Sequence, residues 1–410
     1  MKQPKILVTG ATGRTGRAVV DELLTKGVPV RAVVHSKDAR SAALERKGAE
    51  TVVVDIFDYD QLLAAMRGTQ RAYYLPFYHP YMIQSATAFA VAAREATMEA
   101  VVSLGQWLAS PTHPSLATRQ AWLADQIFSM IPGVMHVRVN PGYFADNYLR
   151  FFIEYAAHLG VFPTIIGDSK DAPPSNEDIA RVVVAALMDP DKHAGKVYRP
   201  TGPALLSGND MTEILGRVLN RKVRRIDLPW WLFLKAARSA NVGAFLVSNL
   251  RYYVEDHKQG AFALSAPTND ILDVTGRPAE DFETTARRYA AQTEVQRNFA
   301  NWLRTLIGFM RNPLNPGYDP ERFDRELRLP EPPAPRLAMG NEDWKAEHGD
   351  RLERGKNTKS PNAAKNAKDL PKRIAVSGDA EANSKKIQFV ADLSLLSVIF
   401  QTRRQLRYQT

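Results

Sequence analysis

The sequence predicts an α/β fold with a doubly wound, mainly parallel sheet, and two observations lead to this prediction. Short apolar runs rich in β-branched residues alternate with segments of helix length, and the first run ends in a glycine-rich turn. The expected strands are 5–9, 28–34, 51–54, 71–75, 100–104 and 134–139. Right-handed crossovers would bring the carboxyl ends of these strands to one edge of the sheet, where ligands bind.

After residue 150 the pattern loosens into helices and short strands. A helix is expected at 176–188, starting from an Asn176 cap, with further helices at 211–219 and 229–237 and a strand at 222–228. A long helical region at 279–310 stops at the Asn312-Pro313 dipeptide. We therefore expect a first domain at 1–150, a smaller, mainly helical portion at 151–312, and an extension at 313–410.

The extension differs from the body in composition and charge. It is rich first in Pro and then in Lys, Asn, Ala and Ser, so we expect it to be largely disordered, with one apolar run at 387–400. Residues 351–410 hold 13 Lys or Arg and 5 Asp or Glu, which places +8 of the net charge of +10 in this tail. The basic charge therefore does not indicate a specific nucleic-acid partner, since the body is nearly neutral.

Composition excludes several kinds of chemistry. The chain contains no Cys, which excludes disulfides, thiolate catalysis and cysteine-bound metals. We expect no metal site, because no His, Asp and Glu cluster has ligand spacing. No secretion signal and no apolar run long enough to span a membrane is visible, so a cytoplasmic protein is expected.

The glycine-rich turn is the sharpest local signal. Residues 5–20 read KILVTGATGRTGRAVV, which is a strand, three glycines and the start of a helix. Gly10 would permit the tight turn, Gly13 the approach of a pyrophosphate, and Gly16 the packing of helix on sheet. Backbone amides at the helix N-terminus would then bind the phosphates, which predicts a dinucleotide site. The residues expected to contribute are Gly10, Thr12, Gly13, Arg14, Thr15 and Gly16.

The end of the second strand bears on the choice between NADP and NAD. An NAD protein usually places a carboxylate there, whereas His35, Ser36 and Lys37 supply none. This favours NADP over NAD, and the alternative is that Lys37 is merely a solvated surface charge. Asp55 and Ile56, past the third strand, are expected beside the adenine, and the alternative role of Asp55 is to cap the next helix.

Together with later segments, these residues resemble the NmrA-like family of atypical short-chain dehydrogenases/reductases, over residues 1 to about 300. The segments that carry the resemblance are the glycine turn, VRAVV at 30–34, VRVNPGYFADN at 137–147, PSNEDIAR at 174–181, GKVYRPTGP at 195–203 and DVTGRP at 273–278. The resemblance implies a Rossmann domain that binds NAD(P) and a smaller C-terminal portion that completes a substrate cleft. It also implies that the nicotinamide pocket is formed by Leu75, Pro76, Ser103, Leu104 and the turn Asn140–Phe144, which includes Pro141. In the family the position of His35 is commonly an arginine that contacts the NADP 2′-phosphate, so this chain departs there.

The sequence lacks the usual proton donor of short-chain dehydrogenases. No Tyr is followed four residues later by a Lys, and Trp122 occupies the approximate place of the family's lysine. Two functions remain open. One is an NAD(P)H-dependent oxidoreductase that passes hydride to a quinone-like or other electron-poor acceptor. The other is a non-catalytic NAD(P) sensor that acts through a regulatory protein partner.

Several polar and aromatic residues are candidates for the substrate side. Ser103, Tyr143 and His113 are the candidate catalytic residues, and His79, Gln106 and Arg119 could also contact substrate. The aromatic cluster Tyr73, Tyr74, Phe77, Tyr78 and Tyr81 could stack on a flat, aromatic substrate or simply form core and wall. The amphipathic stretch 299–310 is expected to pack on the body, and the alternatives are a homodimer contact or contact with a membrane face.

Overall fold

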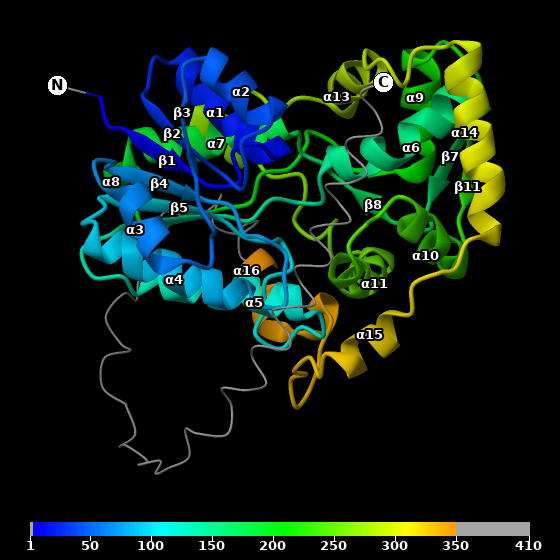
Figure 1. The fold of residues 1–410 in the computed structure, drawn as a ribbon. Helices are drawn as coiled ribbons and strands as arrows, with labels where there is room; N and C mark the ends of the chain where they lie inside the picture. The colour runs from blue at the N-terminus through cyan, green and yellow to red at the C-terminus, as the bar shows by residue number, and fades with distance from the viewer. Residues whose placement is uncertain (1–2, 350–410) are drawn as a thin grey trace. The chain divides into compact units, whose positions relative to one another are not determined.

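The structure, a computed structural model, describes residues 3–349 of the chain (Figure 1). Within these residues one seven-stranded sheet has the order β3-β2-β1-β4-β5-β6-β9, and all its neighbouring strands are parallel. The strands are β1 Ile6–Val8, β2 Val30–Val34, β3 Glu50–Val53, β4 Arg71–Tyr74, β5 Ala100–Leu104, β6 Met135–Val139 and β9 Val197–Tyr198. The doubly wound α/β fold is confirmed, and the six expected strands agree to within two residues at each end.

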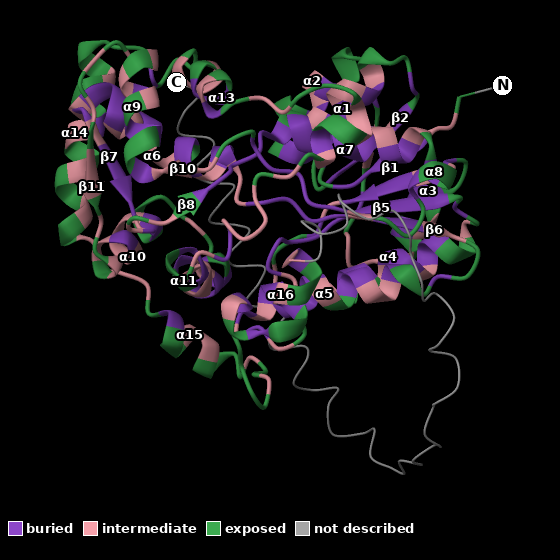
Figure 2. Cartoon of the chain, turned by 180° about the vertical axis from the view of Figure 1, so that it is seen from behind, coloured by how far each residue is buried: buried purple, intermediate pink, exposed green. Residues whose placement is uncertain are grey.

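Helices cover both faces of the sheet, and together they form the first lobe. One face carries α1 Arg14–Thr25, α2 Ala39–Arg46 and α7 Asn176–Met188, with α12 Asp270–Thr275 packed on α7; the other carries α3 Tyr59–Met66, α4 Met82–Glu95 and α5 Leu116–Ser129. Ile6 and Val8 enter the core under α1, while Leu7 enters the opposite core. This alternation is the period of a strand buried on both faces, and Figure 2 shows the strands buried between the helix layers.

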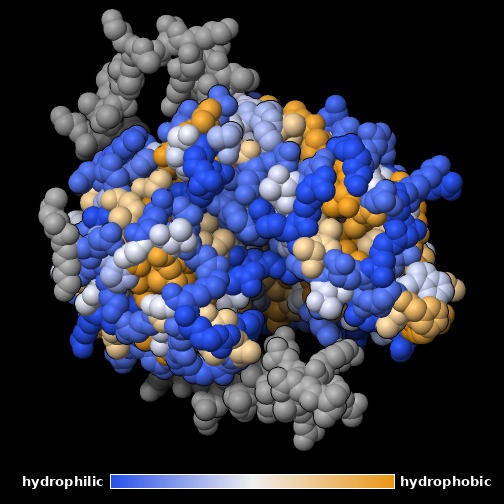
Figure 3. Space-filling model, turned by 90° about the horizontal axis from the view of Figure 1, so that it is seen from above, coloured by the Kyte–Doolittle hydropathy of each residue, from blue (hydrophilic) through white to orange (hydrophobic). Residues whose placement is uncertain are grey.

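A second lobe contains two small sheets and most of the remaining helices. In it β7 Val161–Thr164 pairs in parallel with β11 Arg224–Asp227, and β8 Lys170–Asp171 pairs with β10 Leu206–Ser207. Its helices are α6 Ala145–Leu159, α9 Gly208–Val218, α10 Trp230–Ser239, α11 Ala244–Lys258, α13 Phe282–Ala290 and α14 Phe299–Arg311. Its core joins α6, β7, α9 and α13 through Leu149, Phe162, Leu215 and Phe282. Seen from above, the surface is hollowed between the two lobes and hydrophilic side chains surround the hollow (Figure 3).

The structure differs from the sequence-based expectation at several places in the C-terminal portion, where α11 is among the elements that were not predicted. The helical region expected at 279–310 is two helices, because Asn298 caps the N-terminus of α14 by accepting a hydrogen bond from the Asn301 amide. The cap of α7 is Ser175, while Asn176 is already the first helical residue. The short α8 Pro190–His193 leads into β9, which was not predicted and joins the edge of the main sheet.

Residues 313–349, expected to be part of a largely disordered extension, form ordered elements in the structure. These are η1 Asn312–Leu314, α15 Pro320–Glu326, η2 Ala338–Gly340 and α16 Glu342–Gly349. Trp344 of α16 is only 2% exposed, so this part of the chain contributes to a core. The apolar run at 387–400 and the basic tail lie outside the described residues. Among the residues that are described, every helix is too short or too polar to cross a membrane.

Candidate functional site

The glycine turn lies between β1 and α1, at the carboxyl edge of the sheet where the strand order changes direction. Gly10 has a φ of +60°, a conformation that other residues rarely adopt. A Cβ on Gly16 would lie 2.2 Å from the carbonyl oxygen of Gly10, so only glycine allows helix and turn to pack this closely. Gly10, Gly13 and Arg14 are exposed to solvent, and the turn is therefore open on its outer side.

The N-terminus of α1 is arranged to bind an anion. Gly13 occupies the cap position without a side chain that could satisfy the first amides, and the first turn contains no acidic residue. The Thr15 hydroxyl points inward and hydrogen bonds to Asn176 of α7 at 2.7 Å, which fixes the helix on its neighbour. Arg14 forms an ion pair with Asp146 of α6, and this ion pair connects the two lobes beside the turn. The free amides and the helix dipole are suited to a pyrophosphate.

The residues at the end of β2 present no free carboxylate to a ribose. His35, Ser36 and Lys37 are exposed, and the Lys37 ammonium binds Glu45 and the Thr51 hydroxyl. Asp38 is engaged as the cap of α2, because its carboxylate accepts from the Arg40 and Ser41 amides. These hydrogen bonds, the Arg40 side chain foremost, lower the pKa of Asp38.

Beyond β3, Asp55 is exposed and its carboxylate accepts a hydrogen bond from the Phe57 amide at 3.0 Å. It does not cap α3, because that role belongs to Asp58, which accepts from the Gln61 amide. Ile56 is partly buried against the core under α3 and α4. Asp55 therefore remains available at the edge of the site where an adenine was expected.

The strand ends on the other side of the turn provide mainly apolar surfaces. Leu75 follows β4 and packs against Gly10, since a Cβ on that glycine would meet its Cδ2 at 2.6 Å. Pro76 and Pro141 are buried, and Phe144 is a partly buried residue at the start of α6. These four residues lie at the carboxyl edge, where the nicotinamide pocket was expected.

Ser103 does not face this edge. It is 1% exposed, and its hydroxyl contacts the Asp125 carboxylate at 2.9 Å and the His136 ring at 2.9 Å, both inside the first lobe. Burial raises the pKa of Asp125 to about 6 and lowers the pKa of His136 to about 3, so the histidine is neutral. The side chain of Ser103 thus belongs to a buried polar network that links β5, α5 and β6.

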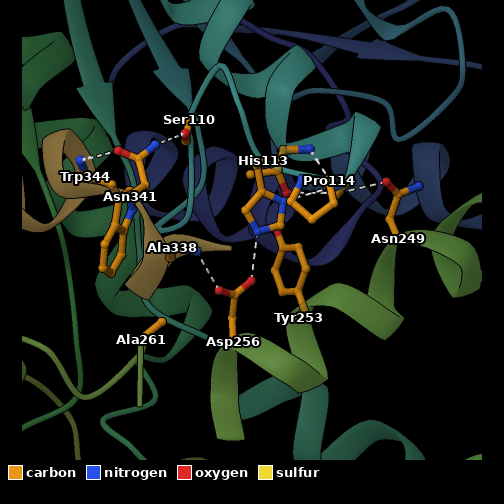
Figure 4. Close-up of polar contacts among 12 residues, drawn as sticks. Ser110, His113, Pro114, Asn249, Tyr253, Asp256, Ala261, Ala338, Asn341 and Trp344 are labelled. Atoms are coloured by element: carbon orange, nitrogen blue, oxygen red, sulfur yellow. Dashed lines mark hydrogen bonds and ion pairs between the residues drawn. The ribbon is translucent and has the colours of Figure 1, made fainter. Parts of the chain in front are cut away.

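His113 is also buried, in a structural network. Its ring accepts the Ser115 amide at 3.0 Å and contacts the Asp256 carboxylate of α11 at 2.8 Å, with no exposed surface (Figure 4). Arg119 supports the same loop by binding the carbonyl oxygens of His113 and Pro114. Neither side chain is free to contact substrate as the sequence suggested.

The aromatic cluster after β4 divides into two groups. Tyr73 and Tyr74 are core residues, whereas Phe77, Tyr78 and Tyr81 are between 40% and 53% exposed. His79 stacks on the Phe77 ring with 5.7 Å between centroids. Three exposed aromatic side chains thus lie on the loop that follows a central strand, where a flat molecule could stack.

Gln106 links this loop to the second lobe. It follows β5, and its amide donates to the Tyr78 hydroxyl at 3.0 Å and accepts from the Tyr253 hydroxyl of α11. Gln106 is 5% exposed, so its hydrogen bonds are formed in a largely dry environment. Of the six polar candidates from the sequence, Gln106, His79 and Tyr143 are the three that lie among the aromatic rings at the carboxyl edge.

Tyr143 follows β6 and lies between the cores of the two lobes. Its ring meets Tyr148, His257 and Phe262 edge to face, with centroids 5.2, 4.8 and 5.7 Å away. Burial raises the pKa of the Tyr143 hydroxyl, which stays protonated at neutral pH. Beside it, burial raises the pKa of Asp171 well above its ordinary value, and Tyr148 donates to this carboxyl group at 3.1 Å.

His257 is a candidate residue that the sequence did not indicate. It is 1% exposed on α11, neither ring nitrogen has a hydrogen-bond partner among residues 3–349, and its ring stacks on Phe262 with centroids 4.1 Å apart. Burial lowers its pKa to about 3. An unpartnered buried imidazole is uncommon and calls for an explanation, such as a catalytic role or a bound water or ion. In the sequence it is one histidine in a charged helix, without any motif that could have identified it.

The fold, the glycine turn and the uncapped α1 define a dinucleotide-binding Rossmann protein. Residues 2–103 match the NmrA-like family. The NAD(P)H azoreductase of Xenophilus azovorans is 30% identical over 293 residues, which are 70% of this chain and 98% of the azoreductase. This chain belongs to the NmrA-like family.

Solved structures agree on the fold. The NADPH-dependent quinone oxidoreductase QOR2 of Escherichia coli in complex with NADPH is similar with a TM-score of 0.60 and 22% identity, over 69% of this chain and 99% of that protein. The negative transcriptional regulator NmrA in complex with NAD is similar with a TM-score of 0.58 and 18% identity, over 70% of this chain and 95% of the regulator. The expected family and the expected class, an NAD(P)-binding oxidoreductase, are confirmed.

Proposed function

We propose that this protein is an NAD(P)H-dependent reductase that passes hydride to a quinone-like or other flat, electron-poor acceptor without a Tyr/Lys pair. The observation that carries the proposal is the uncapped N-terminus of α1 behind the exposed Gly13, next to an edge lined by aromatic side chains. The azoreductase and quinone reductase relatives support a reductive activity on flat molecules.

The residues present suit a dinucleotide along its whole length. The α1 amides would bind the pyrophosphate, Asp55 would meet the adenine, and Leu75, Pro76, Pro141 and Phe144 would enclose the nicotinamide. NAD(P)H supplies the hydride when it is bound. We favour NADP over NAD, because Asp38 is engaged as a helix cap, while the exposed cations Lys37 and Arg40, which pair with Glu45 and Asp38, lie beside the end of β2.

The chain's own residues would stabilise the reduced acceptor. Phe77, Tyr78 and Tyr81 provide exposed rings for stacking, and the protonated Tyr143 hydroxyl is a hydrogen-bond donor for the oxygen or nitrogen that gains negative charge. Such acceptors form stabilised anions, so a tuned tyrosinate is not required for turnover. This explains how the reaction could proceed although no Tyr is followed by Lys four residues later.

The test is a pair of measurements on the full-length protein. Calorimetric titrations with NAD, NADP and their reduced forms measure binding, and a panel of quinones and azo dyes then measures oxidation of NAD(P)H. We expect binding and turnover, with both abolished when Gly13 is replaced by Leu. Binding without turnover on every acceptor would favour the NAD(P) sensor, and absence of binding in all four titrations would refute both functions.

A further inference from the structure

The ordered part of the C-terminal extension folds back onto the body of the protein. The family resemblance ends near residue 300, yet residues 330–348 contact the loop after β5 and helix α11. Arg119 donates to the Pro330 carbonyl, and the Arg336 amide donates to the Thr112 carbonyl at 2.9 Å. The Asn341 side chain donates to the Ser110 and Thr112 hydroxyls at 2.9 and 3.0 Å.

A buried carboxylate connects the extension to α11 and the loop at once. Asp256 of α11 accepts the Ala338 amide at 2.9 Å with one oxygen and contacts His113 at 2.8 Å with the other (Figure 4). Asp256 and His113 have no exposed surface. The buried network of His113 and Asp256 therefore holds Ala338 against the loop that follows β5.

Trp344 is the anchor of this attachment. It is 2% exposed, and its indole N–H donates to the Trp107 carbonyl at 3.1 Å. The two tryptophans pack with Leu108, Ala261 and Phe262, and Tyr143 and Tyr253 lie against the same cluster. The cluster that contains Trp344 therefore borders Tyr143, the proposed hydrogen-bond donor on the acceptor side of the site.

The position of α16 follows from the strands that it contacts. Trp107 follows β5, Tyr143 follows β6, and Arg199 follows β9, and these are adjacent strands of the sheet. Trp344 packs at the first of these strand ends, and Glu347 forms an ion pair with Arg199 at 3.4 Å. Helix α16 thus extends along the carboxyl edge of the β5–β6–β9 half, while the glycine turn occupies the β1–β4 half.

We propose that residues 336–348 form a built-in cover over the acceptor half of the cleft and that Trp344 limits the size of acceptor that the enzyme reduces. The proposal rests on the proposed reductase function. The buried side chains of the cover are Ala338, Asn341, Trp344 and His348. Buried hydrogen bonds to Asn341 and Asp256 hold it in place, so it is a fixed wall. Because the glycine turn lies in the other half, the cover does not affect dinucleotide binding.

The experiment compares full-length variants. Trp344→Ala removes the anchor, Trp344→Phe keeps an aromatic ring but loses the indole N–H, and Asp343→Asn on the exposed side of α16 is the matched control. The ratio of kcat/KM for a three-ring quinone to that for a one-ring quinone is measured, together with the Kd of the reduced dinucleotide. We expect Trp344→Ala to raise the ratio by at least about tenfold, Trp344→Phe to raise it less, and Asp343→Asn to leave it unchanged, with Kd constant throughout.

If the ratio of the two kcat/KM values is unchanged in Trp344→Ala, the proposal that Trp344 limits acceptor size is refuted, whatever the stability of the variant. If Trp344→Ala does not fold, Trp344→Phe decides the question. If the role of Trp344 is purely structural, Trp344→Phe will have a lower melting temperature than the wild type but the same ratio. If the ratio changes and the reduced dinucleotide also binds more weakly, the variant has lost structure generally, and this result would also refute the proposal. Failure of the reductase function is a separate outcome, since it appears as no turnover by the unmodified protein with any acceptor.

Discussion

Substitutions at two glycines of the turn should affect the stability of the protein differently while both weaken dinucleotide binding. In Gly16→Ala, the new Cβ would lie 2.2 Å from the Gly10 carbonyl oxygen and 2.7 Å from its carbon, so the backbone of the turn must move. Overpacking of this kind costs roughly 1 to 3 kcal/mol. In Gly13→Ala the only close contact within the described residues is 3.1 Å to the same oxygen, and the methyl group would occupy space that the proposed pyrophosphate site needs. We expect Gly13→Ala to lose less than about 1 kcal/mol of stability.

Both variants should bind the reduced dinucleotide at least about tenfold more weakly, since each disturbs the phosphate site. Denaturant unfolding measures stability and calorimetry measures affinity. Gly308→Ala is the control, because this exposed helical glycine of α14 has open space around it and should gain about 1 kcal/mol without any effect on binding. Wild-type affinity and stability in Gly16→Ala would refute the packing described for the turn.

Three further predictions follow from single side chains. His257 is held neutral with a pKa near 3, against 6.5 in the unfolded chain, so the stability that depends on neutral His257 is present above pH 6.5 and is lost as the pH falls. Between pH 7 and about 4.5, the free energy of unfolding of the wild type should therefore fall by roughly 3 kcal/mol more than that of His257→Phe, as measured by denaturant unfolding. Parallel pH curves for the two proteins would contradict this. Tyr143→Phe should lower kcat about ten- to a hundredfold with unchanged Kd for the dinucleotide, and unchanged kcat would exclude Tyr143 as the donor. Lys37→Ala should weaken NADPH about tenfold and NADH little, as measured by calorimetry, and an equal effect on both would argue against a 2′-phosphate contact.

The sequence by itself determined the sheet and the glycine turn. Both depend on local order along the chain, because a strand, three glycines and a helix must follow one another, and parallel strands place their carboxyl ends together. Gly10 and Gly16 could be assigned their roles from spacing alone. The break at Asn298 was missed because the apolar spacing continues through it, while a single capping side chain is a weak signal.

Only the tertiary structure decided which candidate side chains reach the cleft. Ser103 ends a central strand, as Leu104 does, but its direction depends on Asp125 and His136, which are 22 and 33 residues away. His257, Tyr143 and Trp344 come together from segments that are more than 80 residues apart in the chain, and no local pattern records such a contact. Burial, which shifts the pKa values of His257 and Tyr143, is a property of the packed molecule, and for this reason the acceptor side could not be predicted from the sequence.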